Sequence, residues 1–108
     1  METIDRYERL LKKIWENSLK YLGLFPVKLL VERVVWDVAK DYPEAELISW
    51  GEDGISLAPL REAMERGEEV ALEEMMDAFV ARYVEILAKL LGKDKAERIR
   101  YLLEEEMK

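Results

Sequence analysis

A long apolar stripe between residues 68 and 91 is the strongest structural pattern in this sequence. Apolar side chains recur there at intervals of three and four residues: Leu72, Met75, Met76, Phe79, Val80, Tyr83, Val84, Leu87, Leu90 and Leu91. This is the period of an α-helix with one buried face, and it predicts a helix over 68–91 that ends at Gly92. Burying ten such side chains contributes roughly 15–30 kcal/mol before conformational entropy is subtracted.

Four further helices are expected from the same kind of periodicity and from helix-ending glycine and proline residues. They cover residues 4–22, 26–41, 57–66 and 95–107. The segment 26–41 is apolar over most of its circumference, with its polar residues in one stripe, and this favours a central helix. A chain of 108 residues has the size of one domain. The sequence therefore predicts an all-α fold, a single five-helix bundle in which residues 1–108 form a single helical domain.

A small β-hairpin insert is predicted near residues 46–57. Two β-favouring segments, 47–50 and 55–57, flank the pair Asp53-Gly54, which is a strong hairpin signal. A two-stranded hairpin is marginally stable by itself, so it should pack on the helices. Trp50, at the edge of this insert, either covers the bundle, contacts a second subunit or faces a ligand.

The composition excludes several classes of function. Cysteine and histidine are both absent, so imidazole bases, thiolate nucleophiles and the usual zinc sites are excluded. The net charge of −7 makes nucleic acid and anionic membranes poor partners. No apolar run is long enough for a transmembrane helix and no signal peptide is recognisable, so a cytoplasmic location is expected. Few amides among many Glu, Lys and Arg residues indicate a thermophilic source.

One acidic helix surface is the best candidate for catalysis. Glu73, Glu74 and Asp77 lie three or four residues apart on the helix 68–91, so their carboxylates are neighbours. Such oxygen ligands suit Mg or Mn ions. The simpler interpretation is that these acids lie on the solvated face opposite the apolar stripe.

The pair Glu74-x-x-Asp77, followed by an apolar helix and the residues LLGKD, resembles the second metal motif of the all-α nucleotide pyrophosphohydrolases of the MazG type. The resemblance covers about 25 residues and implies a magnesium site completed by an E-E-x-x-E or E-x-x-E motif on an earlier helix. The helix 26–41 offers only Glu32, Asp37 and Asp41, at spacings of five and four residues. The first half of the family motif is therefore missing.

Surplus apolar area on the helices 26–41 and 68–91 favours a different function. We expect a non-enzymatic helical binding or regulatory module, a homodimer that acts through protein–protein contacts, with self-association or another protein as partner and with no cofactor. The interface candidates are Trp50, Met75, Met76 and Phe79, although methionines at helical spacing are more commonly core residues. Trp15 and Trp36 are predicted to be core. The alternative is a Mg- or Mn-dependent nucleotide pyrophosphohydrolase-like enzyme that uses Glu74 and Asp77, with Glu73 as a further ligand.

Overall fold

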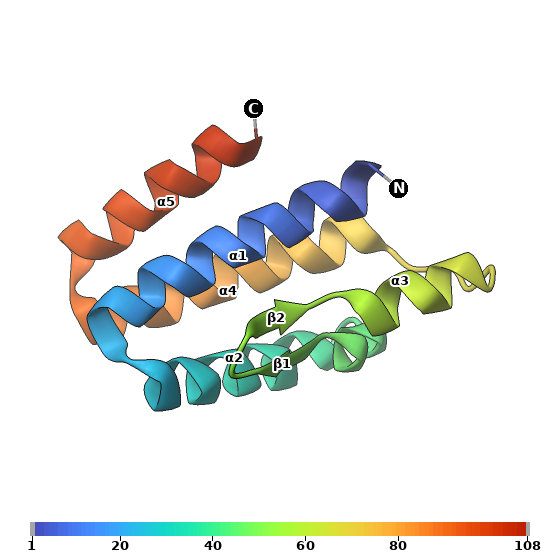
Figure 1. Cartoon of the computed structure of the whole chain (residues 1–108), viewed down its shortest axis with the longest axis horizontal. Helices are drawn as coiled ribbons and strands as arrows, with labels where there is room; N and C mark the ends of the chain where they lie inside the picture. The colour runs from blue at the N-terminus through green and yellow to red at the C-terminus, as the bar shows by residue number, and fades with distance from the viewer. Residues whose placement is uncertain (1, 108) are drawn as a thin grey trace.

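The computed structural model describes residues 2–107, which fold into α-helices and one hairpin (Figure 1). The order is α1 (Glu2–Leu22), α2 (Leu24–Ala39), the 3₁₀ helix η1 (Pro43–Leu47), β1 (Ser49–Gly51), β2 (Gly54–Ser56), α3 (Ala58–Glu65), α4 (Leu72–Leu91) and α5 (Lys93–Met107). These five α-helices and the small two-stranded hairpin confirm the predicted all-α bundle with a β insert. None of the helices within residues 2–107 is long and apolar enough to cross a membrane.

Helices α2 and α5 lie on opposite sides of the pair α1 and α4, and each packs against both members of that pair (Figure 1). The stripe predicted on α4 faces the resulting core, where Met75, Met76, Phe79, Tyr83 and Leu87 are fully buried. Opposite them lie the buried faces of α1, α2 and α5, which include Ile4, Leu11, Ile14, Val31, Val34, Ile99 and Leu103. Residues from every layer thus belong to one hydrophobic cluster.

The hairpin pairs antiparallel, with Ser49 opposite Ser56, Trp50 opposite Ile55 and Gly51 opposite Gly54. Its first strand begins two residues later than predicted, because the 3₁₀ helix η1 extends to Leu47. The flanking residues Ile48 and Leu57 are buried, and the half-buried Trp50 and Ile55 pack against the core. Trp50 therefore covers the bundle, which is one of the three orientations the sequence left open.

Helix α4 begins at Leu72, four residues after the predicted start at Glu68. The amide of Glu68 instead donates a 3.1 Å hydrogen bond to the carbonyl oxygen of Ala63, which closes the end of α3. Gly67, with a φ of 90°, turns the chain at this point. The acidic residues at 68 and 69 thus belong to the connection between α3 and α4.

Helix α1 begins at Glu2, two residues before its predicted start. Helices α2 and α5 also begin two residues early, at Leu24 and Lys93. Each follows a glycine with a positive φ, 80° at Gly23 and 92° at Gly92. A backbone of this shape reverses the chain within a single residue, so the next helix begins at once.

Candidate interaction surface

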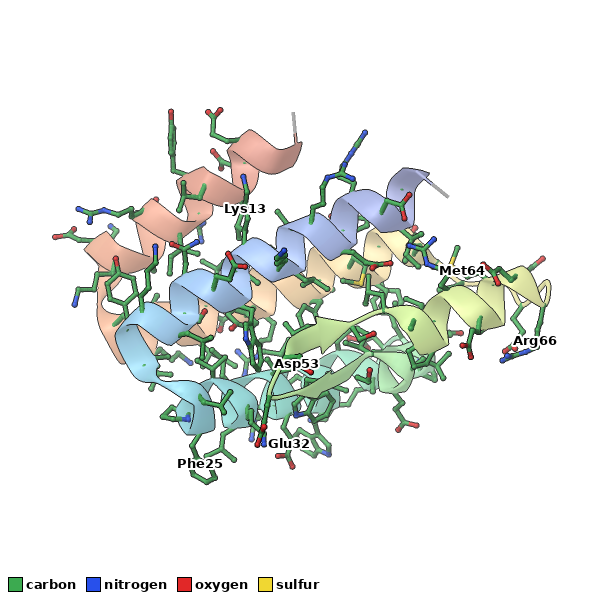
Figure 2. All side chains as sticks on the ribbon, in the orientation of Figure 1. Lys13, Phe25, Glu32, Asp53, Met64 and Arg66 are labelled. Atoms are coloured by element: carbon green, nitrogen blue, oxygen red, sulfur yellow. The ribbon has the colours of Figure 1, made fainter. Side chains whose placement is uncertain are left out.

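The side of α2 that faces away from the bundle carries large exposed apolar side chains. Phe25 is 70% exposed, Leu29 51% and Trp36 56%. At 3.6 residues per turn these side chains share an arc of about 100° with Glu32, Arg33 and Lys40. We call this set of six residues, Phe25, Leu29, Glu32, Arg33, Trp36 and Lys40, the α2 outer face. Figure 2 shows Phe25 and Glu32 projecting from α2 away from α1 and α4.

The structure corrects two predictions about this helix. Helix α2 is an outer helix of the bundle, not its central one, and Trp36 is exposed, not a core residue. The valines of α2, with Leu30, fill the arc that faces α1 and α4, and Trp36 lies outside that buried arc. The signal for this was present in the sequence, because Phe25, Leu29 and Trp36 fall within the same arc as the polar stripe of the helix.

Two cations lie close to the ring of Trp36. The ammonium nitrogen of Lys40 is 3.8 Å from a ring centroid of Trp36, and the guanidinium carbon of Arg33 is 5.1 Å from it. Both distances are within the range of a cation–π interaction. The exposed indole is therefore held in place on the α2 outer face by its neighbours one turn away on either side.

An ion-pair network beside this face joins α2 to α4. The carboxylate of Asp37 accepts a 2.7 Å hydrogen bond from Arg82 of α4 and a 3.3 Å hydrogen bond from Arg33. Burial alone would raise the pKa of Asp37, but these hydrogen bonds and the two positive charges outweigh it and lower the pKa below its usual value. Asp37 thus stays ionised and keeps Arg33 positioned on the α2 outer face.

The middle of the α2 outer face is hollow and carries both signs of charge. A hollow of about 310 Å³ is lined by Leu29, Glu32, Arg33 and Trp36. Glu32 is exposed and makes no ion pair within residues 2–107. The surface therefore has an unpaired carboxylate and a cation at its centre, with Leu29 and Trp36 on either side of them and Phe25 and Lys40 at the two ends.

The interface candidates named from the sequence lie elsewhere. Met75, Met76 and Phe79 are completely buried in the core, so they present no surface to a partner in this structure. Trp50 is half-buried in the hairpin and packs against the core. Most of their long apolar stripe is covered by α1, α2 and α5 of the same chain, but Leu90 near its end is 56% exposed, against the prediction. Exposed apolar side chains that share one side of a helix lie on α2 instead.

The predicted metal ligands do not converge on a site. Glu73 and Glu74 are exposed to solvent, and Asp77 accepts a 3.0 Å hydrogen bond from the hydroxyl of Tyr7 on α1. Burial, and then this hydrogen bond to a negative charge, raise the pKa of Tyr7 to about 12. Among the residues that the structure describes, no group of three or more acidic side chains is arranged to hold a metal ion.

A second hollow, of about 430 Å³, lies between α1, α4 and α5. Its lining is largely apolar and includes Leu10, Val80, Val84 and Leu103, with Asp77, Arg100 and Glu104 as charged members. Unlike the α2 outer face, it is a recess between helices and presents no row of protruding apolar side chains.

No protein-family model, curated protein or solved structure matches this chain.

Proposed function

We propose that this chain is a non-enzymatic helical interaction module that works as a homodimer through the α2 outer face. The observation that supports this proposal most strongly is the exposure of Phe25, Leu29 and Trp36 along one side of one helix. Exposed apolar patches of this kind are uncommon on monomers and mark sites of association. Against the rest of residues 2–107, each of these side chains stays at least half exposed.

A second copy of the chain is the partner that this surface fits. A two-fold symmetric dimer uses the same patch on both copies, so the patch must complement itself. The α2 outer face meets that requirement, because it carries one acidic residue, Glu32, together with the basic residues Arg33 and Lys40. A partner of uniform charge would leave some of these groups opposite a like charge.

The dimer is expected to be reversible. Helix α2 has 16 residues, which span about 24 Å at 1.5 Å per residue, so a single helix pair buries an area at the small end of specific interfaces. A dissociation constant on the order of micromolar suits such an interface. Association that changes with concentration is a property that a regulatory module can use.

The metal-dependent hydrolase proposed from the resemblance has no comparable support. Asp77 is already hydrogen-bonded to Tyr7, and Glu73 and Glu74 point into solvent without converging on it.

We also propose that the protein works at elevated temperature. Two ion-pair networks link helices far apart in sequence: Arg61 of α3 pairs with both Asp5 and Glu8 of α1, and Arg82 of α4 pairs with Asp37 of α2. Networks of this kind gain importance as the hydration of charges weakens on heating. The cytoplasmic location stays a prediction from the sequence.

Light scattering coupled to gel filtration tests the proposed dimer. We expect the mean mass of the wild-type chain to rise from 12.7 kDa towards twice that value as concentration increases. The double variant Phe25→Ser/Leu29→Ser should remain a monomer, because it removes apolar area without touching the core. Tyr101→Ser on α5, where the side chain is 62% exposed, is the matched control and should dimerise like the wild type. A wild-type chain that is monomeric at every concentration contradicts the proposal.

A further inference from the structure

We infer that two copies of the chain pair their α2 helices antiparallel, about a two-fold axis that passes between Glu32 and Arg33. This inference rests on the proposed function and specifies the arrangement of its interface. It follows from the positions of the charged and apolar residues on the α2 outer face. In such a pair, residues equally far from the axis along the two helices face one another.

At the axis, this arrangement places opposite charges together. Glu32 faces the partner's Arg33, and by symmetry Arg33 faces the partner's Glu32, so two ion pairs form. Glu32, which makes no ion pair within residues 2–107, gains one. Asp37 does not lose its partner when Arg33 turns towards the second copy, because its 2.7 Å bond to Arg82 remains. Glu32, Arg33 and Asp37 on this side of α2 therefore each have a counter-charge in the pair.

Away from the axis, the same register matches the apolar residues. Leu29 faces the partner's Trp36, and both of these side chains are more than half exposed in the single chain. One turn further out, Phe25 faces the partner's Lys40, whose ammonium group already lies 3.8 Å from a tryptophan ring centroid. An aliphatic–aromatic contact and a cation–π contact therefore repeat on each side of the axis.

Space for these contacts exists at the axis itself. The hollow of about 310 Å³ is lined by Leu29, Glu32, Arg33 and Trp36, which are the four residues nearest the axis on this face. It gives the partner's side chains a recess to enter, so the two helices can approach closely.

A parallel pairing of the same faces is disfavoured by charge. It would place Glu32 against the partner's Glu32, Arg33 against the partner's Arg33 and Lys40 against the partner's Lys40. Like charges brought together at an interface are strongly unfavourable. The charge order along α2 therefore selects the antiparallel arrangement.

Charge reversal tests the register. Glu32→Arg alone and Arg33→Glu alone each bring like charges together at the axis, and each should weaken dimerisation about tenfold or more in sedimentation equilibrium. The double variant Glu32→Arg/Arg33→Glu should recover most of the lost affinity, because each introduced arginine again faces an introduced glutamate. Glu16→Arg, a reversal at an exposed position of α1, is the control and should leave the affinity unchanged.

Cysteine cross-linking tests the direction of the pairing. The chain has no cysteine, so a single introduced thiol is unique. Glu32→Cys lies next to the axis and should form an intermolecular disulfide under mild oxidation. Lys40→Cys should not, because the antiparallel pair separates the two thiols by about 22 Å along the helices, far beyond disulfide range.

The outcomes separate the two proposals. A wild-type chain that never dimerises overturns the proposed function itself. A dimer that is insensitive to both single reversals, or one in which Lys40→Cys cross-links and Glu32→Cys does not, overturns the antiparallel register and leaves the proposed function standing. Circular dichroism on each variant checks that the helices are intact.

Discussion

The hydroxyl of Tyr83 on α4 donates a 2.9 Å hydrogen bond to the hydroxyl oxygen of Ser18 on α1, and both side chains are fully buried. Ser18 in turn donates a 2.6 Å hydrogen bond to the carbonyl oxygen of Ile14. Every buried side-chain nitrogen and oxygen in residues 3–105 has a hydrogen-bond partner. Within an apolar core, this chain of hydrogen bonds fixes how α1 lies on α4.

Substitutions in this pair should have unequal effects. Ser18→Ala leaves the hydroxyl of Tyr83 buried without a partner and should lower the free energy of unfolding by about 1–3 kcal/mol. Tyr83→Phe leaves Ser18 its bond to Ile14 and should cost only about 1 kcal/mol. The double variant should be less destabilised than the sum of the two single variants. Urea unfolding followed by circular dichroism measures all three, and strictly additive losses would contradict the coupling.

Alkaline pH should destabilise the fold through Tyr83. Burial raises its pKa to about 12 from the ordinary value of 10.0, while its bond to Ser18 acts in the opposite direction. A pKa raised on folding gives stability that is complete below pH 10 and is lost as the pH rises through 12. Between pH 8 and pH 11 the wild type should lose about 1 kcal/mol more than Tyr83→Phe. Equal losses in the two proteins would contradict the raised pKa.

Asp37 should show the opposite dependence on pH. Folding lowers the pKa of Asp37, so its contribution to the free energy of unfolding is complete above about pH 4. That contribution disappears as the pH falls through the lowered pKa of the folded state. Asp37→Asn should therefore lower the melting temperature at pH 7 and have little effect at pH 2. Asp41→Asn, at an exposed position two residues beyond the end of α2, is the control. A similar loss in both variants at pH 7 would show that the bond to Arg82 contributes nothing.

A side chain at Gly54 should destabilise the hairpin through backbone strain. Its φ is 121°, and an added Cβ would lie 3.6 Å from the ring of Trp15, so the strain arises in the backbone and not from a clash. Gly54→Ala should cost about 1–3 kcal/mol of unfolding free energy. Gly51 lies opposite Gly54 in the hairpin, and a Cβ added there would meet no atom within 4 Å. Gly51→Ala should therefore lower the free energy of unfolding by less than Gly54→Ala. Urea unfolding compares the two, and equal costs would contradict this explanation.

Much of the fold follows from the sequence because helical periodicity is a local property. The stripe on α4 predicted the helix and its buried face, including Tyr83, and the pair Asp53-Gly54 predicted the hairpin. Helix boundaries depend on less local contacts. Glu68 reads as the start of a helix, yet its amide closes α3 on Ala63. The apolar pattern of α4 does not show that the amide of Glu68 bonds to the preceding helix, so the start of α4 cannot be read from that pattern alone.

The candidate surface was harder to predict. Trp36 lies among the polar residues of α2, but its large apolar side chain favours a core position, and the position among polar residues is the signal that the structure bears out. The bond from Tyr7 to Asp77 joins residues 70 positions apart, so it depends on how α1 packs on α4. The acidic residues Glu73 and Glu74 are exposed, as the simpler interpretation of that helix predicted.

Sedimentation equilibrium of the unmodified chain tests the central claim most directly, because it measures mass without altering the α2 outer face. The claim predicts a mass that rises reversibly with concentration from 12.7 kDa to a limit of twice that value, with no larger species. A mass that stays at 12.7 kDa up to about 1 mM, a concentration at which even weak specific dimers form, would contradict it.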